Sequence, residues 1–287
     1  DVYKRQIESR ALDIARQVGG IGRHSLMANL EADAARFRAA YDGPVPILPP
    51  DAYRSVVLQA TVGCAYNRCV FCGFYRDRTF RVRGDQEFES HIAAVREAFG
   101  AGISMRRGVF LGDADALSLP TDQLVEFLQM AQALPAAAHG MACFGSSFLG
   151  HSRPASDWVR IKEAGLRRVH LGVETAHPAL RRKLRKPGRA EDALRIVQGL
   201  KAAGISVGMI FLTGVGGESY GAAHVRDSAA LCSAADLDKG DFVYLSPLVG
   251  KEGELTHGPY AEQAEALRAG VGPGPTIAVY DIRHFVY

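Results

Sequence analysis

The chain has 287 residues and a formal net charge of +3, and 47% of its residues are hydrophobic. This length suits one large α/β domain or two small ones, and the hydrophobic fraction is ample for a sizeable core. The small net charge gives no argument for binding to nucleic acid or to a membrane surface. No apolar run approaches the ~18 residues of a membrane span and no signal peptide is recognisable, so we predict a cytoplasmic protein.

The start of the chain consists of two parts. Residues 1–6 have the sequence that a transposon end used in sequencing libraries encodes in this frame, and the chain begins with Asp rather than Met. We therefore expect residues 1–6 to be an assembly artefact and the true N-terminus to be missing. Residues 7–42 show apolar positions at helical spacing, and a proline-rich linker follows them. We predict that residues 1–54 form a helical lead-in and a linker.

Strands and helices alternate from residue 55 onward. Apolar runs typical of strands lie at 55–60, 108–112, 139–144, 168–173, 206–213 and 241–245. Amphipathic patterns lie between them, at 85–99, after Pro120 with Thr121 as a cap, at 155–164, in two pieces split at Pro187 and Gly188, and at 220–235. Six such units predict a parallel sheet covered by helices. Periodicity leaves open whether the sheet is a doubly wound open sheet or a curled partial barrel.

Three of the five cysteines lie in one loop directly after the first predicted strand. Cys64, Cys69 and Cys72 are separated by four residues and then by two, close enough for three thiolates to bind one metal centre. A saturated cubane or a closed zinc site needs four ligands, and no histidine lies between residues 52 and 90. The spacing therefore predicts iron–sulfur ligation with one metal position left open. A zinc site completed by a distant histidine and three free thiols stay open as alternatives, whereas the odd cysteine count argues against a disulfide.

Polar residues and glycines also follow the later strands at their carboxyl ends, where parallel α/β folds gather their functional groups. They are Asp113 and Asp115 after the second strand, Ser146 and Ser147 after the third, Glu174 at the end of the fourth and Gly214 after the fifth. The aspartates, Glu174 and Gly214 have structural alternatives: a turn for the aspartates, a helix cap for Glu174 and a plain strand–helix turn for the glycine.

The fourth strand has two alternating sets of residues. Val169, Leu171 and Val173 alternate with His170, Gly172 and Glu174. If the apolar set meets the helices, the second set faces the inside of a barrel, where a carboxylate needs a partner. His170 is either a satisfied interior histidine or a substrate contact.

The stretch from Thr61 to Arg83 resembles the cluster loop of the radical S-adenosylmethionine (SAM) enzymes, in which three cysteines hold a 4Fe–4S cluster and SAM chelates the fourth iron. The usual spacing there is three residues and then two, and this chain has one residue more between Cys64 and Cys69. The resemblance covers about residues 55–248 and implies a partial, TIM-like (β/α)6 barrel, with residues 249–287 as a C-terminal extension. It is nearest to the broad group that contains the oxygen-independent coproporphyrinogen oxidases and the Elongator-like enzymes.

The resemblance also implies roles for individual residues. Cys64, Cys69 and Cys72 hold the catalytic cluster, and Phe71 packs beside the cluster and the adenine. Gly112, Asp113 and Asp115 take the place of the family's Gly-Gly-Glu motif, which binds the amino group of SAM. Glu174 contacts SAM, Gly214 lies near the adenine and ribose, and Ser147 at the end of the third strand is included among the predicted SAM contacts.

Two groups of basic residues lie beside these positions. They are Arg76, Arg78, Arg81 and Arg83 after the cysteine loop, and Arg181, Arg182, Lys183, Arg185 and Lys186 after Glu174. They predict either binding of an anionic substrate or docking of an acidic electron donor such as a flavodoxin or ferredoxin. A solvated helix face is the alternative for the second group. Cys143 and Cys232 have no cluster spacing and are predicted to be core residues.

The sequence as a whole predicts a radical SAM enzyme that cleaves SAM to a 5′-deoxyadenosyl radical and abstracts hydrogen from an unidentified small-molecule or anionic substrate. A non-enzymatic iron–sulfur or zinc protein is the alternative in another class, and a homologue that binds SAM without reacting is a third. We also expect the C-terminal segment to cover the open side of the barrel, with Tyr280, Arg283 and Tyr287 supplying aromatic and basic groups.

Overall fold

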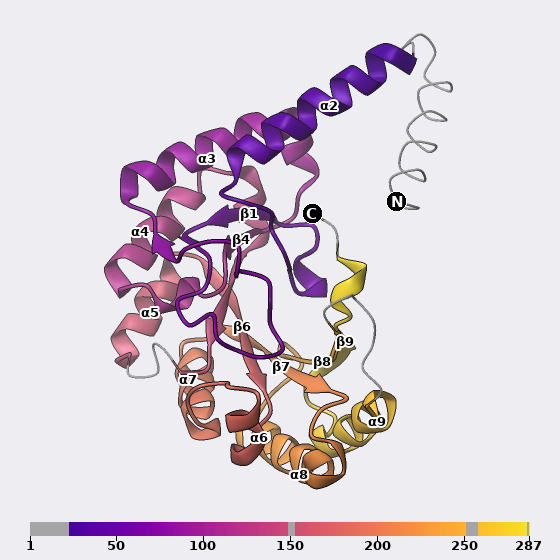
Figure 1. Ribbon diagram of the computed structural model, residues 1–287. Helices are drawn as coiled ribbons and strands as arrows, with labels where there is room; N and C mark the ends of the chain where they lie inside the picture. Colours follow the sequence, from indigo (N-terminus) through magenta and orange to yellow (C-terminus); the bar gives the residue numbers. More distant parts are fainter. Residues whose placement is uncertain (1–22, 149–152, 251–257, 286) are drawn as a thin grey trace.

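The computed structural model describes residues 23–148, 153–250, 258–285 and 287, so residues 7–22 of the predicted lead-in lie outside the described residues. The centre of this described part is a parallel sheet of seven strands (Figure 1). The strands, in their order across the sheet, are β1 (Val56–Gln59), β4 (Val109–Gly112), β5 (Met141–Ser146), β6 (Leu166–Glu174), β7 (Ser206–Thr213), β8 (Phe242–Pro247) and β9 (Thr276–Val279). A separate antiparallel pair, β2 (Thr61–Val62) and β3 (Arg81–Val82), brackets the cysteine loop.

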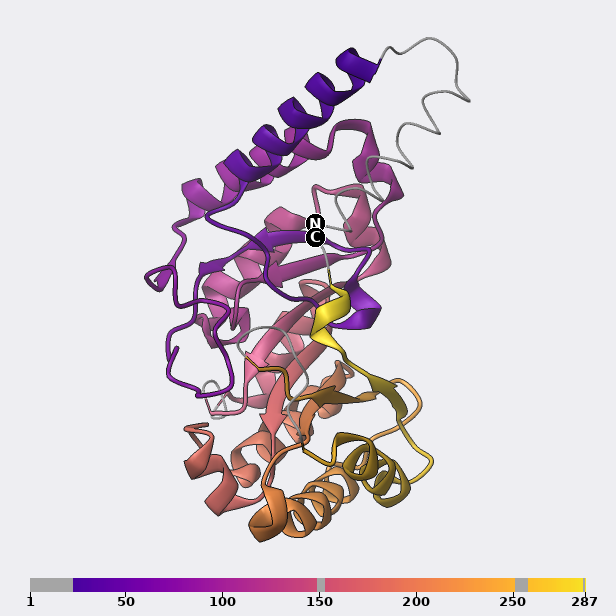
Figure 2. The same cartoon turned by 45° about the vertical axis from the view of Figure 1, so that its right-hand side comes forward.

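Each strand of the large sheet lies next to the strand before it in the chain, so the order never reverses as it does in a doubly wound sheet. Right-handed crossovers then place the connecting helices on one face of the sheet, and the sheet curls away from them (Figures 1 and 2). These helices are α3 (Asp85–Phe99), α4 (Thr121–Ala131), α5 (Ala155–Glu163), α6 (Pro178–Lys183), α7 (Ala190–Ala202) and α8 (Gly217–Ala234). The predicted partial barrel is confirmed.

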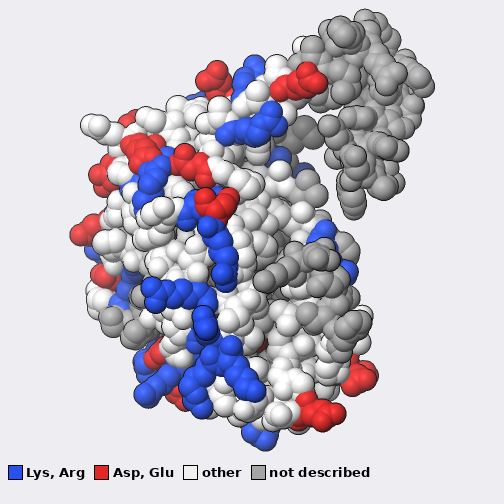
Figure 3. Space-filling model, viewed as in Figure 1, with Lys and Arg blue, Asp and Glu red and all other residues white. Residues whose placement is uncertain are grey.

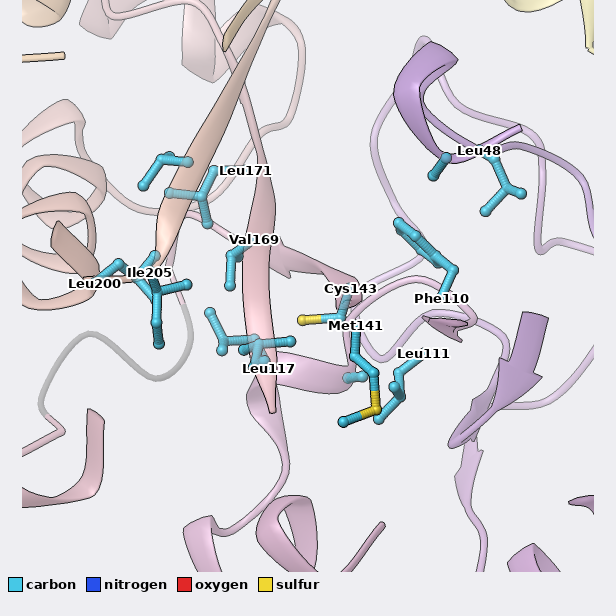
Figure 4. Packing of buried hydrophobic residues seen from close by; sticks show 14 of the residues in the cluster. Leu48, Phe110, Leu111, Leu117, Met141, Cys143, Val169, Leu171, Leu200 and Ile205 are labelled. Carbon is cyan, nitrogen blue, oxygen red and sulfur yellow. The ribbon is translucent and has the colours of Figure 1, made fainter. Parts of the chain in front are cut away.

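The main hydrophobic core lies between the sheet and the helices. Val169 and Leu171 of β6 lie beside Leu200 and Ile205 in this core, and all four side chains are almost fully buried (Figure 4). The alternate residue His170 points the other way, into the barrel, where its Nε2 lies 3.0 Å from Asp51 Oδ1. The predicted facing of the two sets along this strand is therefore confirmed.

The start of α4 differs from the prediction. Pro120 occupies the N-cap position without a side-chain hydrogen bond, and Thr121 is the first helical residue. The hydroxyl of Thr121 donates to Asp157 Oδ2 in α5 at 2.6 Å. The predicted Thr121 cap is wrong because this hydroxyl joins two neighbouring helices instead of closing the end of its own.

The sheet continues into the C-terminal segment beyond the six predicted strands. Helix α9 (Tyr260–Val271) packs on α8, and β9 adds to the edge of β8. After β9 the chain crosses to the other edge of the sheet, where the Tyr287 hydroxyl accepts a hydrogen bond from the Val57 N–H of β1 at 2.7 Å. The segment therefore bridges the open side of the barrel, as predicted, although Arg283 pairs with Asp281 at the surface.

Helix α2 (Arg23–Ala40) lies along α3 at the edge of the molecule (Figures 1 and 2). Its carboxyl end is anchored by Phe37, whose ring lies 5.7 Å from that of Phe99. None of the helices in the described part of the chain is long and apolar enough to cross a bilayer.

Candidate active site

A cavity of about 200 Å³ lies inside the barrel at the carboxyl ends of the strands. One water molecule needs only about 10–15 Å³ on this measure, so the cavity accepts a far larger molecule. The polar and sulfur-containing residues of its wall are Cys64, Tyr66, Cys69, Cys72, Tyr75, Asp115, Ser146, Glu174, Lys186, Ser246 and Tyr280. Phe71 also lines it. All three clustered cysteines thus face one interior space.

The cysteine loop is held in place by its own polar residues. Asn67 adopts a left-handed backbone conformation, and its Nδ2 donates to the Tyr75 carbonyl at 2.8 Å. The Arg76 guanidinium donates to the carbonyls of Cys69 and Cys72 at 2.9 and 3.2 Å. These hydrogen bonds to backbone carbonyls restrict the conformation of the loop. The three thiols are therefore held on the side that faces the cavity.

Asp113 anchors the beginning of this loop to the sheet. Its Oδ2 accepts from the Gly63 N–H at 2.9 Å, and its Oδ1 accepts from Gln59 Nε2 at 3.0 Å. The Arg78 guanidinium lies 3.6 Å from the same carboxylate. Asp113 therefore fixes where the loop leaves the first strand and does not itself line the cavity.

The thiols match the donor set of an iron–sulfur cluster. Burial raises the pKa of Cys69 to about 11 and also raises the pKa of Cys72, so metal binding there releases protons. In the described ranges, no three or more His, Cys, Asp or Glu side chains are arranged around the position of a single metal ion. A 4Fe–4S cluster attaches each cysteine to an iron of its own, and three thiols that face one cavity fit that group.

Glu174 forms an ion pair inside the cavity. Its Oε1 lies 3.2 Å from Lys186 Nζ, and both residues line the wall. The strand residue beneath them is Gly172, where an added Cβ would lie 2.7 Å from Glu174 Oε1 and 3.1 Å from Lys186 Nζ. The absence of a side chain at Gly172 therefore makes room for the pair.

Arg181 stabilises the turn that carries this pair. Its buried guanidinium donates to the carbonyls of Val173 and Thr175, each at 2.9 Å, and to the carbonyl of Pro187 at 2.7 Å. These bonds join the residues just before and after Glu174 to the segment that carries Lys186. The alternative prediction that Arg181 belongs to a solvated helix face is wrong, because its guanidinium is buried and donates to the carbonyls at the end of β6.

Asp115 and Ser146 line the cavity, and each carries a buried polar atom without a hydrogen-bond partner among the described residues. Asp115 Oδ1 accepts from the Ser118 N–H at 3.1 Å, but Oδ2 and the Ser146 hydroxyl are buried and have no hydrogen-bond partner within the described part of the chain. Burial raises the pKa of Asp115 to about 6, and the nearby hydroxyl and N–H of Ser146, together with the Ser118 N–H, offset part of the rise. Buried polar atoms without partners are rare in proteins, so these two atoms are available to a ligand.

Four of the predicted SAM contacts do not line the cavity. They are Gly112, Asp113, Ser147 and Gly214. The Ser147 hydroxyl accepts from Arg181 Nη2 at 3.2 Å, and the Gly214 N–H donates to Gln263 Oε1 at 2.8 Å. These groups serve the scaffold.

Six polar residues of the cavity wall were not among the predicted site residues: Tyr66, Tyr75, Ser146, Lys186, Ser246 and Tyr280. Strand β5 runs to Ser146, two residues beyond its predicted end, and a period-two count from the inward-facing Phe144 selects Ser146 over Ser147. Lys186 was predicted only as one member of a basic group, and Tyr280 was predicted to lie over the open side of the barrel rather than in the SAM site.

Most arginines of the first basic group, after the cysteine loop, bind carbonyls or carboxylates of the chain itself. Arg78 donates to the carbonyls of Asp42 and Pro44 at 3.2 and 3.1 Å. Arg81 and Arg83 both pair with the carboxylates of Asp42 and Glu87. Lys186 is the basic residue of the two groups that lines the cavity.

The sequence matches the family model of the radical SAM superfamily over residues 58–228, and the chain belongs to this superfamily of enzymes. Similar solved structures include methylornithine synthase (PylB), at 16% identity and a TM-score of 0.52 over 91% of this chain and 79% of that chain. They also include HydG, a maturase of the [FeFe]-hydrogenase, at 13% identity and a TM-score of 0.52 over 95% and 67% of the two chains. At these identities the likeness shows the fold alone.

The chain spans only about a quarter of another similar structure, the cobalamin-dependent radical SAM enzyme OxsB. That match has 16% identity and a TM-score of 0.48, and it covers 61% of this chain and 26% of that chain. No curated protein matches the sequence with significance.

Proposed function

We propose that Cys64, Cys69 and Cys72 bind a 4Fe–4S cluster and that SAM binds beside it in the same cavity. The observation that carries this proposal is the convergence of three thiols, two unsatisfied polar atoms and one ion pair on a single interior space. When bound, the cluster and SAM together supply one-electron cleavage of a carbon–sulfur bond and a 5′-deoxyadenosyl radical that removes hydrogen from a substrate.

The residues of the chain divide the binding of SAM among them. The Asp115 carboxylate and the Ser146 hydroxyl accept hydrogen bonds from the SAM ammonium group. Lys186 attracts the SAM carboxylate and Glu174 accepts hydrogen bonds from a polar group of SAM, while Phe71 packs against the adenine. The mainly apolar wall limits contact with water, which protects a reactive radical from side reactions.

The test is 5′-deoxyadenosine formation by the anaerobically reconstituted protein with SAM and dithionite. The wild type forms the product, and Cys69→Ala abolishes both the product and the cluster. Cys232→Ala is the matched control, because Cys232 is buried in α8 and lies outside the cavity wall. A wild type that holds four irons per chain and forms no product would contradict the proposal and favour a sensing, electron-transfer or non-reacting protein.

We also propose that an acidic electron donor, such as a flavodoxin or ferredoxin, docks over the cysteine loop. The Val70 N–H donates to the Leu184 carbonyl at 3.1 Å, which joins the loop to the end of α6. Exposed basic residues lie on both segments: Arg68 and Arg76 on the loop, and Arg182, Lys183 and Arg185 at α6. Figure 3 presents Lys and Arg side chains gathered over this face, and the exposed Val70 lies within the same loop.

Charge reversal tests the docking. Replacing Arg182 and Lys183 with Glu is expected to slow SAM cleavage driven by reduced flavodoxin about tenfold, because complementary charge chiefly raises the association rate. The same variant is expected to keep its rate with dithionite. Arg38→Glu, on exposed α2, is the control. An equal loss with both reductants would contradict the docking site.

A further inference from the structure

Tyr280 adds a polar group to the cavity from the last strand of the sheet. The residue follows β9, and its backbone N–H donates to the Leu245 carbonyl of β8 at 2.9 Å. Its ring lies 5.8 Å from the ring of Tyr244, and the residue is 2% exposed. The hydroxyl is buried and has no hydrogen-bond partner among the described residues, although the residue lines the cavity. A buried donor without a partner costs free energy that an acceptor on a ligand would recover.

The wall around Tyr280 is mainly apolar. Ile47, Phe144, Ile210 and Ile282 pack around it in one hydrophobic cluster, and all four also line the cavity. The cation of the described wall, Lys186, pairs with Glu174 and is assigned above to the SAM carboxylate, so it is not a counter-charge for a second anion. An anionic group placed against this wall would lose its hydration without gaining a counter-charge. Burial raises the pKa of Tyr280 well above its ordinary value, so the hydroxyl is a neutral donor.

We propose that this part of the cavity receives an uncharged, mainly apolar portion of the substrate that carries a hydrogen-bond acceptor, and that the Tyr280 hydroxyl donates to that acceptor. A carbonyl or an aromatic ring nitrogen on a hydrocarbon framework fits this description. The proposal rests on the proposed function, which assigns the cysteine side of the same cavity to the cluster and SAM.

Fluorine NMR titration of the cluster-loaded protein, with SAM and without reductant, tests the proposal with three probes of similar size. 4-Fluoroacetophenone carries an acceptor, 1-ethyl-4-fluorobenzene lacks one, and 4-fluorobenzoate carries a charge. The wild type is expected to bind the acetophenone about 3- to 10-fold more tightly than the ethylbenzene, the range of one net hydrogen bond. Tyr280→Phe keeps the ring and is expected to lose this preference.

Tyr244→Phe is the matched control. The Tyr244 hydroxyl donates to Asp51 Oδ1 at 2.5 Å, and the residue does not line the cavity. This variant is expected to lower the melting temperature and keep the probe preference. Tyr280→Phe is expected to melt at or above the wild-type temperature, because no bond within the described protein is lost.

Several outcomes would overturn the proposal. They are a preference that survives in Tyr280→Phe, a preference that Tyr244→Phe also abolishes, tightest wild-type binding of the benzoate, and a lower melting temperature of Tyr280→Phe. Equilibrium dialysis of SAM against the wild type separates this result from the proposed function. If SAM does not bind, the proposed function fails. If SAM binds and the probe preference is absent, only the substrate proposal fails.

Discussion

Two aspartates face the barrel interior from opposite ends and differ in how their carboxylates are satisfied. Asp51 enters from the linker before β1, and its side chain, 19% exposed, contacts His170, Tyr244 and Arg168. Burial pushes the pKa of Asp51 upward, but the hydrogen bonds and charge of these partners hold it well below its ordinary value. Asp115, at the carboxyl end, has one oxygen without a hydrogen-bond partner in the described part of the chain, and burial raises its pKa to about 6.

This difference indicates that Asp51 contributes to stability and that Asp115 contributes to ligand binding. A carboxylate with three partners stabilises the fold, whereas a buried carboxylate with a free oxygen costs stability until a ligand supplies a donor. The Asp51 cluster at the amino end of the barrel interior (Asp51, Arg168, His170 and Tyr244) therefore stabilises the fold. The carboxyl end carries polar atoms that can form hydrogen bonds with a ligand.

Asp51→Asn tests the stabilising role of the Asp51 cluster, and it is expected to change the free energy of unfolding more than the other variants do. The amide loses the charge that pairs with Arg168 and His170, and the free energy of unfolding is expected to fall by about 2 to 3 kcal/mol. Urea denaturation measures the change. The control is Asp122→Asn, whose carboxylate pairs with Arg160 at the exposed surface and is expected to change stability by less than about 0.5 kcal/mol.

Asp115→Asn is expected to have the opposite sign. The variant removes a buried charge that lacks a full set of partners, so the ligand-free protein is expected to gain about 1 to 2 kcal/mol at pH 7. Urea denaturation under the same conditions measures it. A loss of stability as large as that of Asp51→Asn would mean that the two ends do not differ.

The sequence predicted much of this arrangement because the relevant signals are local. Helix α3 has the predicted bounds, and the alternation along β6 gave the correct facing of Glu174 and His170. Three cysteines in one short loop, together with polar residues at the carboxyl ends of parallel strands, indicated the position of the cavity. A strand order that follows the chain order explains why these ends lie together.

The remaining features depend on contacts between distant parts of the chain. Asp51 lies 119 residues before His170, and nothing in the linker indicates that its side chain enters the barrel. Tyr280 reaches the cavity only because β9 extends the sheet. Arg181 has the local sequence of an exposed base, and its burial follows from the carbonyls of a turn that forms only in the folded protein.

Alanine substitutions at two glycines test the same difference between the two ends of the barrel, with smaller expected changes in stability. Gly208 lies beside His170 and Tyr244, and Gly172 lies beside Glu174 and Lys186. In Gly208→Ala the new Cβ would meet the His170 and Tyr244 rings at 2.8 and 3.0 Å, and packed rings cannot yield, so a loss of about 1 to 2 kcal/mol is expected. In Gly172→Ala it meets the flexible ends of Glu174 and Lys186, so the loss is expected to stay below about 1 kcal/mol while SAM binding weakens. Thermal melts and SAM dialysis on both variants measure the two effects, and equal stability losses would contradict the distinction.

The pH dependence of stability provides the finest test. The folded pKa of Asp51 is lowered, so its contribution is present at neutral pH and is lost as the pH falls below about 4. The folded pKa of Asp115, about 6, lies above its unfolded value, so its penalty disappears as the pH falls from 7 to about 4. Over that interval the stability advantage of Asp115→Asn over the wild type is expected to shrink, while the disadvantage of Asp51→Asn stays constant. Urea midpoints at several pH values measure both differences, and an advantage that does not change would contradict the raised pKa.

The most direct test of the central claim is SAM affinity, measured by equilibrium dialysis of cluster-loaded proteins. The double variant Asp115→Asn, Ser146→Ala removes a charged acceptor and a hydroxyl from the carboxyl end and is expected to bind SAM about 10- to 100-fold more weakly. Asp51→Asn, assayed at a temperature where it is folded, is expected to bind SAM as the wild type does. Unchanged affinity in the double variant, or an equal loss in both, would contradict the assignment of the unsatisfied carboxyl end to SAM.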